Sequence, residues 1–215
     1  MISTMKPIQP IYPTVPRQFP AFLNVYRTVI LNMSVILLVS IVAALCIGKY
    51  AAKKHKDNSQ KTAWLFIGIT VLVSAGLFCF FGCSAITVKG IILCLILTFC
   101  SYSDIMTREC DDYPHLMIVI AALIGTELSA LPGMFLSALA IFGIMLLTCL
   151  MKATVNGADL KLATACTFFL GFEKGVAGLL VGLILAVTVN LIKKNKKGFP
   201  LIPYLAIGYM MAFFI

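Results

Sequence analysis

Charge is scarce in this chain, and negative charge is the scarcest. Of its 215 residues, 12% are Asp, Glu, Lys or Arg, and only 8 of these are acidic. A soluble domain has about a quarter of its residues charged and about half apolar. Here 61% are hydrophobic, and the mean hydropathy is +1.03. This composition argues against an ordinary soluble domain and predicts an all-α, polytopic bundle of membrane-spanning helices.

Patterns typical of metal, redox or nucleic-acid sites are also missing. No C-x-x-C pair occurs among the 8 cysteines, most of which lie inside or beside apolar runs, where they act as small hydrophobic residues. Neither His55 nor His115 has a metal partner at ligand spacing. The net charge of +9 comes from short basic clusters and not from a recognised nucleic-acid motif. We therefore predict no metal, no cofactor and no nucleic-acid partner.

The start of the chain has no basic segment leading into an apolar run, so we expect no cleaved signal peptide. Residues 1–20 are Pro-rich and predict an extended arm. A spanning helix needs about 20 mostly apolar residues. The apolar runs predict about eight spans, near 25–48, 62–82, 84–103, 114–131, 133–151, 160–172 (a short one), 175–192 and 199–215.

Two lysine clusters set the orientation. Residues 48–61 carry five lysines and residues 193–198 carry four, and such clusters mark the cytoplasmic side of a membrane protein. The two clusters lie on the same side only if the short segment 160–172 is counted as a span. That count also puts the loops 104–113 and 152–159 on the cytoplasmic side, in contact there with the lipid headgroup region.

Each of these two loops carries an aspartate at a helix end. Asp104 closes the span 84–103, and Asp159 opens the segment 160–172. Carboxylates near hydrocarbon are costly and usually functional. Two carboxyl groups within a few ångströms share one proton, so that one serves as a base toward water while the other donates to a carbonyl. This is aspartic-peptidase chemistry, although a single aspartate in such a place is more often solvated or a helix cap than catalytic, and Asp159 alone could simply cap the helix 160–172.

The residues around these aspartates resemble the type IV prepilin peptidases, the A24 family of GxGD-type membrane aspartic proteases. Asp104 and Arg108 match the family's D-x-x-x-R loop, and Asp159 with Lys161 matches its G-x-G-D-x-K motif. A late proline- and glycine-containing segment is matched by Pro200, Pro203, Tyr204, Leu205, Ala206 and Gly208. The resemblance covers about residues 85–215 and implies that Asp104 and Asp159 are catalytic, supported by Arg108, Gly157, Ala158 and Lys161.

The glycine motif is altered in this chain. Asn156 and Ala158 stand where the family has glycine, and a glycine lies between them at position 157. Alanine permits close backbone approach, but it does not adopt a positive φ cheaply. Family members that also methylate their product carry a cysteine-bearing insertion, and nothing in this sequence matches it. The chain is therefore most similar to the short, peptidase-only members that serve Tad/Flp or archaeal-type pili, and we expect no N-methyltransferase activity.

The resemblance predicts three parts: the arm 1–20, N-terminal membrane helices with their basic loop over 21–83, and an aspartic peptidase core over 84–215. It implies an endopeptidase of the cell membrane that removes basic leaders from prepilin-like proteins at the cytoplasmic face. A catalytically inactive pilus-assembly homologue and a proton- or cation-coupled transporter using the Asp pair are the alternatives.

The loop after Asp104 is the densest acidic region of the chain. The resemblance implies prepilin-like substrates in which a short basic leader precedes an apolar helix. We predict that Glu109, Asp111 and Asp112 attract this leader, while the two lysine clusters steer it inward by repulsion.

Overall fold

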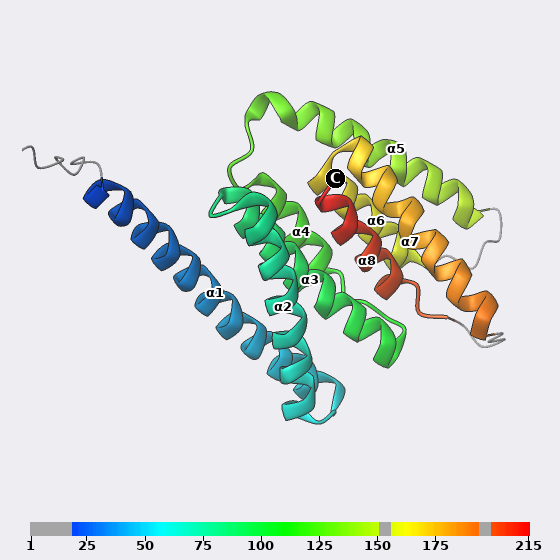
Figure 1. Ribbon diagram of the computed structural model, residues 1–215. Coiled ribbons are helices and arrows are strands. Elements are labelled where there is room, and N and C mark those ends of the chain that lie inside the picture. The colour runs from blue at the N-terminus through cyan, green and yellow to red at the C-terminus, as the bar shows by residue number, and fades with distance from the viewer. Residues whose placement is uncertain (1–18, 151–155, 194–198) are drawn as a thin grey trace, which may run out of the picture.

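The protein is a bundle of helices (Figure 1). The computed structural model describes residues 19–150, 156–193 and 199–215. These residues contain no strand, which confirms the predicted all-α fold. The helices are α1 (Phe19–His55), α2 (Ser59–Phe81), α3 (Ala85–Thr107), α4 (Tyr113–Leu123), η1 (Leu128–Ala130), α5 (Leu131–Leu150), α6 (Gly157–Leu170), α7 (Phe172–Lys193) and α8 (Ile202–Phe213).

Five of these helical segments are long and apolar enough to cross a membrane, which indicates a multi-pass membrane protein. They are Arg27–His55, Ser59–Phe81, Ala85–Thr107, Leu128–Leu150 and Phe172–Ile192. The predicted arm, apart from its last two residues, lies outside the described residues, as do most of the basic cluster 193–198 and part of the loop 152–159.

The predicted basic loop 48–61 is largely helical. Helix α1 continues to His55, and α2 begins at Ser59, so only three residues connect the two helices. Lysine is a good helix former, and cations in the last turn of α1 interact favourably with the negative end of the helix dipole. The side chain of Asn58 then accepts hydrogen bonds from the N–H groups of Gln60 and Lys61 and starts α2.

Three predicted spans are shorter helices. The run predicted over 114–131 ends as α4 at Leu123, because the chain turns at Gly125 with a φ of +65°. The run 199–215 forms the 12-residue α8, and the short segment 160–172 is the 14-residue α6. Hydropathy identified each run, but the helix ends depend on local backbone geometry.

Helix α3 is the most buried of the five long segments and packs against α1, α2, α4 and α8. Helix α6 packs against α4, α5, α7 and α8. The fully buried side chains Leu97 of α3, Leu162 of α6 and Leu205 of α8 belong to one hydrophobic core. The two helices that carry the predicted aspartates are therefore joined through α4 and α8.

Glycines bring α7 and α8 together, as the red and orange helices of Figure 1 show. A Cβ added at Gly208 would meet the carbonyl oxygen of Gly178 at 2.3 Å and the nitrogen of Gly182 at 2.5 Å. In membranes, small residues stabilise such contacts because they let backbones approach closely. This packing explains the glycine of the late motif.

One end of the bundle gathers the ends of six helices, α1, α2, α3, α4, α6 and α8. We call this region, made of residues 53–62, 101–115, 156–161 and 199–203, the polar end. Contacts across it join Lys54 to Asp111, Lys161 to Asp112, and Asp104 to Ile202. Asp104 and Asp159 thus lie at the same end of the molecule.

Candidate active site

Asp104 lies in the last turn of α3 and is 5% exposed. Its Oδ2 accepts a hydrogen bond from the backbone N–H of Ile202 at 3.1 Å. Ile202 is the first residue of α8, and the first N–H groups of a helix have no partner within it. A carboxylate is favourable at this positive end of the helix dipole. The side chain of Asp104 therefore caps α8 while being held by it.

Asp159 lies in the first turn of α6 and is 4% exposed. Its Oδ2 accepts a hydrogen bond from the backbone N–H of Asn156 at 3.0 Å, so the capping role is present. A cap alone would lower the pKa of this carboxyl. Burial instead raises the pKa of Asp159 to about 6; the Asn156 N–H opposes this shift, and the charge of Asp104 adds to it. Asp159 is thus a cap whose ionisation is costly.

The two carboxyl groups come from helices whose backbones stay apart. No Cα of α3 lies within 8 Å of a Cα of α6, although both helices pack against α4 and α8. The charge of Asp104 nevertheless acts on Asp159. The two buried carboxyl groups therefore lie at the same polar end, where the charge of Asp104 adds to the raised pKa of Asp159.

The altered glycine motif fits its place without strain. Gly157 and Ala158 lie in the first turn of α6, and neither has a positive φ. A Cβ added at Gly157 would meet nothing within 4 Å. The expected cost of alanine at position 158 is therefore absent, because the backbone there is helical.

Arg108 and Lys161 support the ends of the two helices. Arg108 ends α3 in the left-handed conformation, with a φ of 58°, and its N–H donates to the carbonyl oxygen of Asp104 at 2.9 Å. The Nζ of Lys161 is 2.6 Å from Oδ1 of Asp112. This ion pair ties the loop after Asp104 to the helix that carries Asp159.

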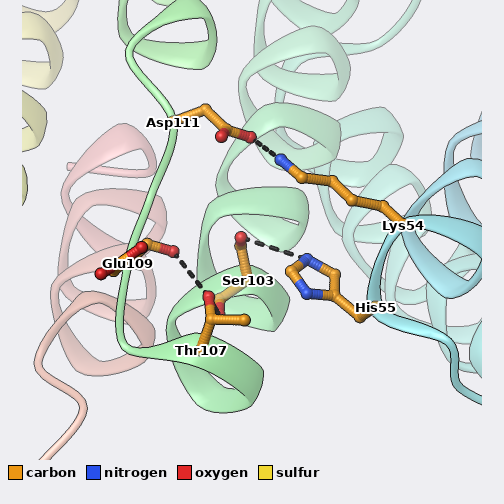
Figure 2. Close-up of polar contacts among 6 residues, drawn as sticks. All are labelled: Lys54, His55, Ser103, Thr107, Glu109 and Asp111. Carbon is orange, nitrogen blue, oxygen red and sulfur yellow. Dashed lines mark hydrogen bonds and ion pairs between the residues drawn. The ribbon is translucent and has the colours of Figure 1, made fainter.

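The acidic loop is paired with lysines of the chain itself. Figure 2 shows Lys54 reaching from the end of α1 to Asp111, and His55 beside it within 3.2 Å of the hydroxyl of Ser103. Asp112 is paired with Lys161, which lowers the pKa of this aspartate. Thr107 donates through Oγ1 to the carbonyl oxygen of Glu109 at 3.2 Å (Figure 2). A basic leader would thus approach Asp111 and Asp112 when each already forms an ion pair with a lysine of the chain.

One further carboxylate at the polar end, that of Asp57, was not predicted as part of the site. Asp57, between α1 and α2, accepts hydrogen bonds from the hydroxyls of Tyr102 at 2.7 Å and Thr62 at 3.1 Å. The Tyr102 bond is the main reason that the pKa of Asp57 is lowered. The sequence signal was present, since Asp57 is the only acidic residue among the five lysines of 48–61.

His115 is the other residue whose surroundings the sequence did not indicate. It is buried in α4, and neither of its ring nitrogens has a hydrogen-bond partner among the residues that the structure describes. Within the part of the chain that the structure describes, no group of three or more His, Cys, Asp or Glu side chains could hold a metal ion.

Residues 91–191 match the model of the type IV leader peptidase family. The match confirms the resemblance seen in the sequence. The leader peptidase region includes Asp104 and Asp159 and all of α4, α5 and α6. No curated protein and no solved structure matches the chain. The similarity of this region to the type IV leader peptidase family supports a peptidase, that is, a hydrolase that acts on a protein substrate.

Proposed function

We propose that the protein is a membrane aspartic endopeptidase that removes the basic leader of prepilin-like proteins at the cytoplasmic face of the cell membrane. The observation that carries the proposal is the pair of buried carboxyl groups, Asp104 and Asp159, at one end of the bundle. Burial raises the pKa of Asp159, and the charge of Asp104 adds to that shift. Both lie within the region that matches the leader peptidase family.

In this mechanism Asp104 and Asp159 share one proton. The ionised carboxylate takes a proton from a water molecule, whose oxygen attacks the carbonyl carbon of the scissile peptide bond. The protonated carboxyl donates to the carbonyl oxygen, and collapse of the tetrahedral intermediate breaks the C–N bond as the amine takes up a proton. The raised pKa of Asp159 makes it the better candidate for the protonated partner. Asp104, which accepts the Ile202 N–H, then serves as the base.

The basic segment at the end of α1 supports a cytoplasmic position for this site. Lys53 and Lys54 lie in the last turn of α1, and Lys54 contacts the loop that follows Asp104. Lysine-rich segments next to spans favour the cytoplasmic side. The site and the basic segment belong to the same end of the bundle, so both face the same compartment.

The experiment is co-expression of the protein with candidate prepilins, followed by gel electrophoresis of the substrate. Loss of a leader is expected with the wild-type chain and not with an empty vector. Intact-mass measurement of the product tests the peptidase-only assignment, because a mature chain one methyl group heavier, made by this protein alone, would contradict it. An uncleaved substrate across the whole prepilin panel would favour the inactive assembly homologue.

A further inference from the structure

A groove opens between α2, α3 and α8, next to the candidate active site. Its volume is about 690 Å³. Helices α2 and α8 form its walls and have no backbone contact with each other, although both pack against α3, which forms the floor. Each helix contributes residues three or four apart, such as Leu65, Ile69 and Val73 of α2, which lie on one helical face.

The groove has two different ends. At one end Asp57, Thr62 and Tyr102 form a hydrogen-bonded cluster. At the other end, the ring centroids of Phe214 and Phe80 lie 5.4 Å apart. This aromatic contact joins the two walls of the groove. Between these ends the lining is overwhelmingly apolar, and the floor carries the small side chains of Cys94, Thr98 and Ser101. Small residues allow close helix approach in a membrane.

The dimensions suit one helix. The lining of α2 runs from Lys61 to Val73, a rise of about 18 Å at about 1.5 Å per residue. A helix of that length and about 10 Å diameter fills roughly 1,400 Å³. The groove would therefore hold about half of its cross-section and leave the other half facing lipid.

The end of the groove that holds Asp57, Thr62 and Tyr102 adjoins Asp104. The lining residues Ser101, Tyr102 and Ile105 surround it in sequence on α3, and the lining residue Pro203 follows Ile202, which donates to its carboxylate. A polypeptide helix lying in the groove would thus have one end close to Asp104. A lipid acyl chain would fill apolar space but would have no peptide bond to present there.

We infer that this groove binds the apolar membrane helix of the substrate and holds the leader junction beside Asp104 and Asp159. The inference rests on the proposed function. The groove is the specificity surface for the part of the substrate that is retained, while the acidic loop faces the part that is removed.

Photo-crosslinking tests the inference without requiring cleavage. A benzophenone amino acid is placed at Ile69, in the groove, or at Leu72, three residues further along and 76% exposed outside it. Both variants carry Asp104→Asn and are co-expressed with a prepilin. A substrate adduct at least several-fold stronger from position 69 is expected. Equal adducts from both positions, or adducts only with lipid or with a second copy of the chain, would overturn the inference.

A kinetic comparison uses active protein. Ile69→Trp should raise KM several-fold and leave kcat nearly unchanged, while Leu72→Trp should alter neither. If the wild-type protein cleaves a prepilin and Ile69→Trp leaves KM unchanged, the groove is not where the substrate helix binds. Failure of the wild-type protein to cleave any prepilin would instead count against the proposed function, since the crosslinking pattern is measured separately.

Discussion

The backbone N–H of Ile202 and the carboxylate of Asp104 are joined by a hydrogen bond of 3.1 Å across 98 residues of sequence. The bond fixes the end of α3 to the start of α8. It also means that the orientation of a candidate catalytic side chain depends on a helix outside the region that matches the leader peptidase family.

Asp104→Asn and Asp159→Asn should each abolish leader cleavage, because an amide cannot take up or release the shared proton. Asp111→Asn is the matched control, since Asp111 belongs to the adjacent loop and pairs with Lys54. It should retain most activity. Cleavage is measured by gel shift, and membrane content by blotting. Cleavage by either Asn variant at nearly the wild-type rate would rule out the aspartic mechanism.

Ionisation of Asp159 should lower the free energy of unfolding at neutral pH relative to its value at about pH 4. Its pKa is raised from 3.8 to about 6, so the folded state binds the proton more tightly than the unfolded state. The stabilisation is complete below about pH 4 and is lost as the pH rises through about 6, a change of about 3 kcal/mol. Asp159→Asn removes this dependence.

The melting temperature in detergent should therefore be higher for Asp159→Asn than for the wild type above pH 6, and the difference should shrink toward pH 4. Asp111→Asn serves again as the control. A difference between wild type and Asp159→Asn that stays constant from pH 4 to pH 8 would contradict the raised pKa.

The acidic loop should affect substrate capture and not the chemical step. Replacing Glu109, Asp111 and Asp112 by their amides should raise KM several-fold, weaken its dependence on salt, and leave kcat nearly unchanged. Loss of kcat in the triple variant would place one of these three carboxylates in the active site.

Lys54→Met tests the same loop by removing the lysine that is paired with Asp111, where the triple variant removes the carboxylates. It frees Asp111 for a basic leader, so KM should fall by up to about fivefold, the equivalent of a surface ion pair of about 0.2–1 kcal/mol. Lys53→Met, on the same turn of α1, is the control and should change KM less. If Lys54→Met lowered kcat instead, the ion pair would serve to hold the loop in place.

Gly208→Ala should separate α8 from α7, because the new Cβ would lie 2.3 Å from the carbonyl oxygen of Gly178. We expect a lower melting temperature and loss of most activity, since Ile202 moves with α8. Gly143→Ala is the control: a Cβ there meets nothing within 4 Å, and helical Gly→Ala changes stabilise by about 0.5–1 kcal/mol. Equal tolerance of both changes would show that the α7–α8 contact is not tight.

Sequence patterns predicted where the two aspartates lie along the chain, because hydropathy locates apolar runs and a charge at the end of a run is easily seen. They did not predict the partners of these charges. The pairing of Lys54 with Asp111 requires α1 to continue to His55, and lysines that form a helix look the same in sequence as lysines in a loop. The end of α4 depended on the φ of Gly125, which hydropathy does not report.

Sequence patterns also could not predict the groove or the α7–α8 contact, and the reason is different. Gly178, Gly182 and Gly208 can be read as small residues, but which faces meet depends on the packing of the whole bundle. Asp57 and Tyr102, 45 residues apart, show the same limit, because only the fold brings them within 2.7 Å.

The group that holds the carboxylate of Asp104 is the main-chain N–H of Ile202, and this has a consequence for mutagenesis. Nearly every amino acid supplies the same N–H, so substitutions at position 202 preserve the donor whatever side chain they introduce. Proline is the exception, since it has no N–H. Because the side chain of Ile202 is itself fully buried, an alanine at this position measures lost packing, and only the proline variant removes the N–H donor. The donor itself survives every other substitution, whereas the carboxylate that it holds does not.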